Sequence, residues 1–242
     1  MSGLTGLLGE LHGVWNAGVQ TTRGQDLWYI LAAVVISTLN HPKHVCQVYS
    51  VAEKTIVETT LPEQQQIEKQ KMVVRLREGL FKSFPIVGYP KVINALSELN
   101  QVIPDTVKLG LPTEPTRIED SWEDVVEQRR RGRECFDKIY DRHSQRVIDI
   151  MQAGHPDLAQ TALYHLYGPV LSDPRSLDGK DTSLVVVACL MAQNLPSQLK
   201  GHWYGALHQG VTLDELETVQ KSVAKLCGFY NVPWCQMPKK TQ

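Results

Sequence analysis

Apolar residues recur along this chain at the spacing of a helix, and turn and cap residues separate the apolar stretches. Thr212 and Glu215 have the spacing of a capping box, in which two side chains bond the backbone at a helix start. The helix that they open has a core-facing stripe at a period close to 3.6 residues, formed by Leu213, Leu216, Val219, Val223 and Leu226. Thr60 and Glu63 repeat the box ahead of a second stripe, formed by Ile67, Met72, Val73, Leu76 and Leu80. Both patterns predict amphipathic helices.

Two shorter stretches are apolar on every side. Residues 184–190 are rich in β-branched side chains, which favours a buried strand. No partner strand is predicted anywhere in the chain, however, and a helix-turn-helix pattern follows directly, so we predict a buried helix there. Residues 28–39 are also apolar, but they fall far short of the ~20 residues that a membrane-spanning helix needs. The predicted fold class is all-α.

The middle of the chain is polar and rich in proline. A connector over residues 104–120 separates a first region, residues 1–103, from a second region, residues 121–242. In the second region Ser121 begins a long charged helix that we expect to reach about Met151.

The same short pattern of turn and cap residues occurs twice. The first copy consists of Asn40, Pro42, Ala52, Thr60, Glu63, Glu78, Lys82 and Gly88, and the second of Asn194, Pro196, Ala206, Thr212, Glu215, Glu217, Lys221 and Gly228. In both copies twelve positions separate the asparagine from the alanine. Repetition at matched spacing indicates one supersecondary unit used twice, so we predict two pseudo-equivalent helical halves. His202 in the second copy stands where the first copy has Val48.

Composition and charge narrow the classes of function. The chain has 242 residues, of which 42% are hydrophobic, and a formal net charge of −1. These values suit a soluble protein of one or two domains and give no general attraction to nucleic acid or to acidic membranes. The basic run Arg129–Arg133 lies among acidic residues and is interpreted as a solvated helix face. The five cysteines have no Cys-x-x-Cys spacing, so we expect reduced intracellular thiols and no metal site.

Targeting signals are not recognisable in the sequence. The start of the chain lacks the features of a secretory signal and is poor in arginine for a mitochondrial presequence. The final residues Lys239–Gln242 do not form a peroxisomal ending of the Ser-Lys-Leu type. We therefore expect a cytoplasmic protein, and leave the peroxisome and the mitochondrion open.

His202 is the candidate for chemistry. On its predicted helix it shares a mostly apolar face with Gln198, and the small residues Gly205 and Ala206 beside it leave room for another helix or a ligand. A neutral imidazole in such a place can exchange a proton near pH 7, because its unperturbed pKa is about 6.5. From the residues alone, a structural histidine and a catalytic histidine are both open.

Glu217 is the predicted catalytic partner of His202, because it lies one turn into the following helix. Glu215 is expected to be occupied by its capping role. Glu78 has the matching position in the copy that lacks the histidine, which favours a structural part for Glu217. Both roles of Glu217 are open.

Five segments carry a resemblance to a known family. They are the apolar stretch 183–188, the segment Leu199–Thr212 with its histidine, Gly-Ala pair and glycine turn, Glu215, and two segments elsewhere, residues 77–90 and 137–168. Together they resemble the carboxymuconolactone decarboxylase family, and residues 137–168 are similar to the linking region of its fungal two-repeat members. The resemblance implies the all-helical fold that this family shares with the alkylhydroperoxidase D-like (AhpD-like) proteins.

The family so resembled divides into two chemistries. Its alkylhydroperoxidase branch has a Cys-x-x-Cys pair one and two turns before the histidine, for thiol-dependent peroxide reduction. The corresponding positions here are Leu195 and Gln198. The decarboxylase branch lacks that pair and uses a histidine, which His202 matches. Acidic or arginine residues that are often found nearby in that branch are replaced here by Ser183 and Tyr164.

The leading hypothesis is an enzyme, a lyase of the carboxymuconolactone decarboxylase type. It would act on a small carbonyl or carboxylate compound, with His202 as proton donor or acceptor and without a metal or a cofactor. The residues that we expect to bind this substrate are Tyr164, His165, Gln198, Gly205 and Ala206. A thiol-dependent peroxidase, disfavoured by the missing cysteine pair, and a non-catalytic oligomeric scaffold are the alternatives. Family members are oligomers, so we also expect a homo-oligomer.

Overall fold

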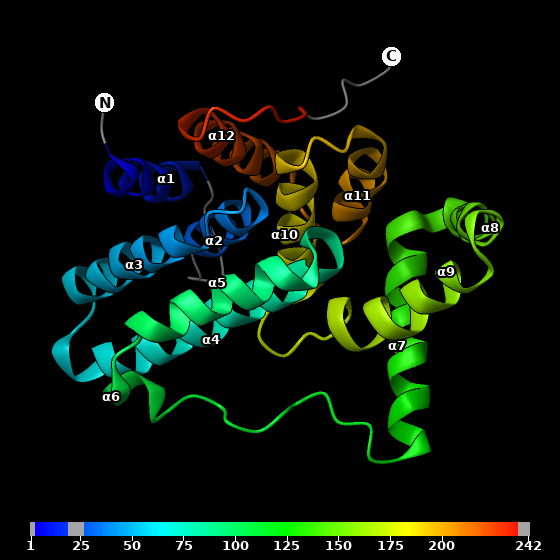
Figure 1. The fold of residues 1–242 in the computed structure, drawn as a ribbon, viewed down its shortest axis with the longest axis horizontal. Helices are drawn as coiled ribbons and strands as arrows, with labels where there is room; N and C mark the ends of the chain where they lie inside the picture. The colour runs from blue at the N-terminus through cyan, green and yellow to red at the C-terminus, as the bar shows by residue number, and fades with distance from the viewer. Residues whose placement is uncertain (1–2, 19–26, 237–242) are drawn as a thin grey trace.

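The computed structural model of the chain describes residues 3–18 and 27–236, and within these ranges it contains helices and no strand (Figure 1). The predicted all-α fold is confirmed. No helix in the described ranges has the length and apolar character needed to cross a membrane.

The first half of the chain forms one side of the molecule, with α4 running across it beneath α2 and α3 (Figure 1). Its helices are α1 (Leu4–Gly18), α2 (Trp28–Thr38), α3 (Val45–Thr59), α4 (Pro62–Val87), α5 (Tyr89–Val102) and the short α6 (Asp105–Lys108). A turn of 3₁₀-helix, η1 (Pro42–His44), precedes α3.

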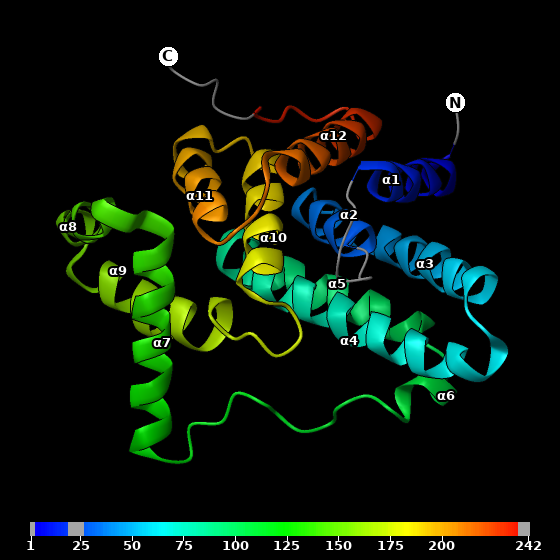
Figure 2. The ribbon, with the colours of Figure 1, turned by 180° about the vertical axis from the view of Figure 1, so that it is seen from behind.

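The second half begins with a lobe that stands at the opposite end of the molecule, seen from behind in Figure 2. This lobe contains α7 (Trp122–Tyr140), a 3₁₀ turn η2 (Asp141–His143), α8 (Ser144–Gly154), α9 (Pro156–Thr161) and a π-helix, η3 (Ala162–Leu171). The chain then returns to the centre as α10 (Gly179–Ala192), α11 (Pro196–His208) and α12 (Leu213–Phe229).

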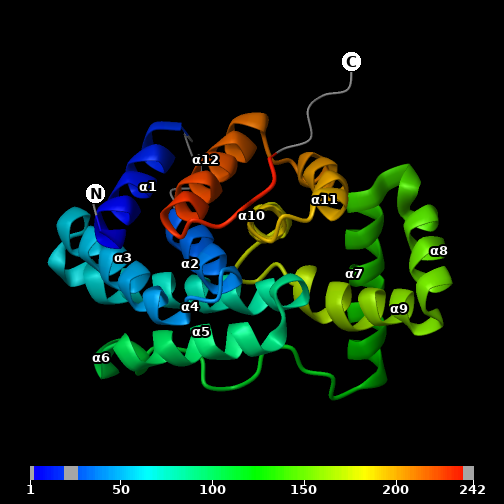
Figure 3. The ribbon, with the colours of Figure 1, turned by 45° about the horizontal axis from the view of Figure 1, so that its top comes forward.

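Helices α2 and α10 form the centre of the core. Every residue of α2 is buried, and so is every residue of α10 from Thr182 to Ala192. The two helices pack against each other and against α4 and α12, and Figure 3 shows α10 end-on between its neighbours. Helices that are apolar on every side are stable only in such a place. The buried helix predicted over residues 184–190 is confirmed.

The two halves share an order of elements. Each has a buried helix, an asparagine with a positive φ, a proline that starts the next helix, and then a further helix. Asn40 has φ 63° and Asn194 has φ 56°, a left-handed conformation that asparagine tolerates better than most residues. Superposition of the two halves stays a prediction.

The predicted caps are only partly formed. Thr212 and Glu215 make the capping box expected for α12. The matching box at Thr60 is absent, because α4 follows Leu61 with no side-chain cap, so that prediction is wrong. Asn194, one of the turn and cap residues of the repeated pattern, has the role of a turn residue: it takes the left-handed conformation, and Leu195 occupies the cap position of α11.

The long helix predicted from Ser121 to about Met151 is two helices. It begins as expected, with a capping box between Ser121 and Asp124, but α7 ends at Tyr140. Asp141 takes φ 49°, which a continuing α-helix does not allow, and the hydroxyl of Ser144 donates to its carbonyl oxygen. The break leaves Tyr140 at the end of α7, where that helix meets α11.

The connector between the halves follows α6 as an irregular segment on the outside of the molecule, along the lower edge in Figures 1 and 2. Arg117 fixes it to the core: its guanidinium donates to a carboxylate oxygen of Glu78 and to the carbonyl oxygen of Pro169. The connector is therefore attached both to α4 and to η3.

Candidate functional site

His202 on α11 faces the end of α7. Its Nε2 lies 3.2 Å from the phenolic oxygen of Tyr140. Tyr167 on η3 donates its own hydroxyl proton to the Tyr140 oxygen across 3.4 Å. Phe136 packs edge-on against Tyr167, with ring centroids 5.0 Å apart. The structure thus places one imidazole and two phenols from three separate elements in a single hydrogen-bonded chain.

Glycines explain how α11 comes so close to α7. A Cβ atom on Gly205 would lie 2.4 Å from Cγ2 of Ile139, and one on Gly201 would lie 3.3 Å from the ring of Tyr140. The sequence predicts substrate binding at Gly205, because small residues leave room for a helix or a ligand. Here a helix fills that room.

The same device brings η3 against α7. A Cβ atom on Gly132 would lie 2.5 Å from the backbone of Gly168, so the two backbones are in contact at this point. Gly168 follows Tyr167 in η3. π-Helical backbone is rare and is found frequently at functional sites. In this chain it sets the position of Tyr167 relative to Tyr140.

The site favours uncharged groups. Burial lowers the pKa of His202 to about 4, since desolvation disfavours the imidazolium form. Burial also raises the pKa of Tyr140, and raises the pKa of Tyr167 well above its ordinary value. At neutral pH the site therefore holds a neutral imidazole and two protonated phenols.

The cavity at His202 is small. Its volume is about 10 Å³, which is room for about one water molecule. Its lining includes Cys135, Ile139, Thr182, Ser183, Val186 and Gln209. In this conformation no carbonyl or carboxylate compound fits beside His202.

Cys135 is a member of this cavity that sequence analysis did not single out. It lies on α7, half-buried, in a segment far from His202 in the chain. Burial raises the pKa of its thiol to about 11, so the thiol is protonated at neutral pH. A protonated thiol is a poor nucleophile. Cys135 and Tyr167 have no characteristic sequence spacing from His202. They reach the site only through the fold of the linking region, so the sequence pattern could not identify them.

The structure does not bring the other predicted site residues into this cavity. Glu217 is exposed on α12, and no hydrogen bond or ion pair among the described residues joins it to His202. Gln198 and His165 are exposed, and Ala206 is fully buried in helix packing. The guanidinium of Arg129 lies over the ring of Tyr164. The functional roles predicted for Glu217, Gln198, His165, Ala206 and Tyr164 stay predictions, and the positions of these residues do not support them.

Glu78, the counterpart of Glu217 in the first half, is engaged in structure. Its carboxylate accepts from Arg117 and lies 3.9 Å from Nζ of Lys82. Lys82 is fully buried and donates to the carbonyl oxygens of Asp173 and Leu177 and to the hydroxyl of Thr182. This cluster joins α4 to the segment before α10. In the part of the chain that the structure describes, no three His, Cys, Asp or Glu side chains could together hold a metal ion.

Comparison with known proteins finds a family model and relatives that this chain resembles. Residues 156–233, which include His202, Tyr167 and α10–α12, match the model of the carboxymuconolactone decarboxylase family. The chain is 32% identical over 204 residues to Peroxisomal protein 2 of Schizosaccharomyces pombe, an alignment that covers 83% of this chain and 87% of that protein. It is 25% identical over 257 residues to Peroxisomal protein 2 of Saccharomyces cerevisiae, covering 87% and 90%.

The chain belongs to the carboxymuconolactone decarboxylase family. The resemblance inferred from the sequence is thereby confirmed. The match to the carboxymuconolactone decarboxylase family begins inside the lobe, at the start of α9, and so includes Tyr167 but not Tyr140 or Cys135. The names of the two yeast relatives give a compartment and no reaction.

Proposed function

We propose that this protein is an enzyme of the carboxymuconolactone decarboxylase type that acts on a small carbonyl or carboxylate compound, with His202 as its acid–base group. The observation that supports the proposal is the chain from Tyr167 through Tyr140 to Nε2 of His202. An imidazole with a lowered pKa, held by one phenol beside a small cavity, is the kind of group that acid–base catalysis uses.

The hydrogen-bonded chain gives His202 a defined tautomer. When Tyr140 donates to Nε2, the ring proton lies on Nδ1, which faces away from the phenol and is the atom available to a substrate. In a decarboxylation, the bond between the carboxyl carbon and its neighbour breaks, its electron pair stays on the carbon left behind as an enolate, and carbon dioxide leaves. Nδ1–H then protonates that carbon while Nε2 takes the proton of Tyr140. When the site opens, Nδ1 takes up a proton from solvent and Nε2 returns its proton to Tyr140, which restores the starting state of both residues.

Substrate entry requires a more open conformation. A cavity of about 10 Å³ admits no organic substrate, so α7 must move away from α10 and α11 before the proposed reaction. Motions of this kind occur in many enzymes on microsecond to millisecond timescales. The site would then close over the bound compound and exclude water.

The test compares His202→Gln with the unchanged protein on a panel of lactone carboxylates and β-keto acids, by measuring released carbon dioxide. We expect a loss of about 10²–10⁴-fold in turnover, the usual contribution of a positioned acid–base group. The unfolding free energy should change by no more than about 1–2 kcal/mol. His143→Gln is the control, because His143 is exposed on η2 and belongs to no predicted site. Equal turnover by both histidine variants contradicts the proposal.

A non-catalytic role is the second candidate, and the small volume beside His202 favours it. In that case His202 is a packing residue and the whole panel stays unconverted. The two candidates differ in one further respect: as a packing residue, His202 would cost several kcal/mol of stability when replaced by Gln. We propose that the protein forms a homo-oligomer under either candidate function. Light scattering at micromolar concentration tests this, and a strictly monomeric species contradicts it.

We also infer a peroxisomal location, in place of the cytoplasmic one expected from the sequence. The support is the name of the two relatives, each aligned over most of its length. Co-localisation of an internally tagged protein with a peroxisomal matrix marker tests this inference, and diffuse cytoplasmic signal in cells with intact peroxisomes contradicts it.

A further inference from the structure

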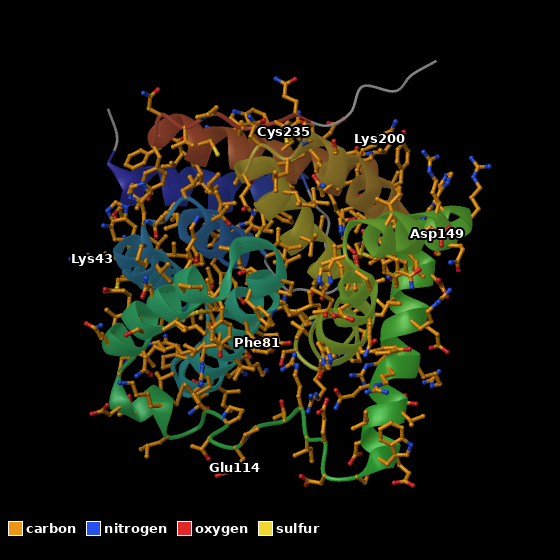
Figure 4. The ribbon with its side chains drawn as sticks, turned by 45° about the vertical axis from the view of Figure 1, so that its right-hand side comes forward. Lys43, Phe81, Glu114, Asp149, Lys200 and Cys235 are labelled. Carbon is orange, nitrogen blue, oxygen red and sulfur yellow. The ribbon has the colours of Figure 1, made fainter. Side chains whose placement is uncertain are left out.

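A second cavity lies beneath the connector, and none of its lining residues belongs to the cavity at His202. Its volume is about 390 Å³, within the range of small-molecule sites. Val74 and Phe81 on α4 and Leu96 on α5 form its apolar side, and Pro112 and Pro115 of the connector close it from outside. Figure 4 shows Phe81 on α4 and Glu114 on the connector, two residues that line this cleft. We call it the connector cleft.

The connector is held at both ends and stiff between them. Leu111 is buried in the core on one side. On the other side the guanidinium of Arg117 bonds Glu78 and lies 4.7 Å above the ring of Phe81. Between these anchors Pro112 and Pro115 restrict the backbone, so the connector spans the cleft without filling it. Because the cleft is already formed, a ligand can enter it without reordering of the connector, which lowers the cost of binding.

One cation on the inner wall of the connector cleft has no counter-charge among the described residues. Glu78 is balanced by Arg117 and by buried Lys82. Arg77, one residue earlier on α4, is exposed and has no hydrogen bond or ion pair among the described residues. A guanidinium binds a carboxylate in a fixed two-point geometry. Glu114 on the outer wall is also without a partner in the described ranges, and it repels an anion.

Two hydroxyl groups complete the polar lining. Thr116 and Ser176 both line the cleft, and neither side chain makes a hydrogen bond within the part of the chain that the structure describes. A ligand with an apolar body would lie against Phe81 and the prolines, with its polar end at Arg77 and these hydroxyls.

We propose that the connector cleft binds a small carboxylate with an apolar body, such as a medium-chain fatty acid, with Arg77 holding the carboxylate. This site does not depend on the reaction proposed at His202. The two sites share no lining residue. The His202 cavity is formed by α7, η3, α10, α11 and the residue after α11, and the connector cleft by α4, α5, the connector and Ser176 in the segment before α10.

The experiment measures binding of octanoate and of octan-1-ol by calorimetry to the full chain. We expect octanoate to bind, and Arg77→Gln to weaken it by about tenfold or more, because a charge-assisted hydrogen bond contributes that much. Octan-1-ol, which has the same chain without the charge, should bind the unchanged protein and Arg77→Gln equally. Glu114→Gln should bind octanoate more tightly, because it removes the repelling charge.

Matched controls make each outcome decisive. Arg146→Gln removes an exposed arginine on α8, outside the cleft, and should leave octanoate affinity unchanged. His202→Gln should also leave it unchanged. Circular dichroism checks that every variant is folded. Octanoate affinity that is equal in Arg77→Gln and the unchanged protein, or that is lost in His202→Gln, overturns the proposal, as does absence of octanoate binding.

Discussion

The phenolic oxygen of Tyr140 lies 3.2 Å from Nε2 of His202, and this contact joins the lobe to the core. Tyr140 is the last residue of α7, and His202 is in the middle of α11. The contact depends on the turn at Asp141, which ends α7, and on Gly201, which allows the ring of Tyr140 to approach α11. A site at such a junction can respond to movement of the lobe.

Tyr140→Phe keeps the ring and removes the hydroxyl between Tyr167 and His202. We expect the unfolding free energy to fall by about 1–2 kcal/mol, since one buried hydroxyl and one ring nitrogen lose a partner. Urea denaturation followed by circular dichroism measures the change. Tyr204→Phe is the matched control, because Tyr204 is exposed on α11. Equal stability of the two variants would show that the contact contributes nothing.

Gly205→Ala tests the close packing of α11 on α7. Alanine normally stabilises a helix relative to glycine by about 0.5–1 kcal/mol. At Gly205 we expect the opposite, a loss of about 1–3 kcal/mol, because the added methyl group would overlap Ile139. Gly9→Ala in α1 is the control: nothing lies within 4 Å of its added Cβ atom, so it should stabilise. Thermal denaturation of both variants is the measurement, and a gain at Gly205 contradicts the packing argument.

Lys82→Met tests the buried cluster beneath α10. The ammonium group of Lys82 has three hydrogen-bond acceptors and is fully buried. Its removal leaves Glu78 with one cation fewer and takes one donor from each of the three acceptors. We expect a loss of about 3–5 kcal/mol, typical of breaking a buried ionic group. Lys71→Met on the same helix removes an exposed ion pair with Glu68 and should cost less than about 1 kcal/mol. A loss of similar size in both variants contradicts this account.

The fold class was predictable because a period of about 3.6 residues between apolar positions indicates helices. The stripe that includes Leu216 and Val219 belongs to α12, and the residues buried on every side, 184–190, belong to α10. Caps were harder to predict. Thr60 and Thr212 have similar neighbours in sequence, yet only Thr212 makes the box. Thr212 is the residue directly before α12, whereas Leu61 has that position before α4 and Thr60 lies one residue further out.

The candidate site was predictable only in part. His202 was identified from its place in the second half and from the family resemblance. Tyr140 was not identified, because the break at Asp141 that positions it has no proline or glycine to signal it. The sequence favours Tyr164 over Tyr167, three residues on, since helical spacing does not reveal which face of a π-helix points to Tyr140. Contacts between segments that are distant in sequence decide which side chains meet in the site. The spacing of residues within one segment carries no information about those contacts.

Peroxide reduction is expected to be absent. Leu195 and Gln198 stand at the positions of the thiol pair in the alkylhydroperoxidase branch, and both are exposed. Cys189 is fully buried, and burial raises its pKa to about 12, which opposes thiolate formation. An assay with a hydroperoxide and a dithiol donor should therefore give no sustained turnover. Turnover that Cys135→Ser or Cys189→Ser abolishes would contradict the prediction and identify the thiol responsible.

Stability should depend on pH through His202. The pKa of this residue is about 4 in the folded chain, against an ordinary value of 6.5. Its contribution is complete above pH 6.5, where both states are neutral. As the pH falls from 6.5 to 4, the unfolded chain takes up a proton that the folded chain does not, so the unfolding free energy falls by at most about 1.4 kcal/mol per pH unit. Below pH 4 this residue adds no further change.

His202→Gln removes this dependence and isolates it from that of other groups. His44 also has a lowered pKa, through burial and the nearby His41, and contributes a slope of the same sign in both proteins. We therefore expect the stability difference between the unchanged protein and His202→Gln to shrink by roughly 1–3 kcal/mol from pH 7 to pH 4. Urea denaturation at four pH values measures it. A difference that stays constant over this range would mean that His202 is solvated in the folded chain, and that the neutral imidazole on which the proposed chemistry rests is not present at low pH.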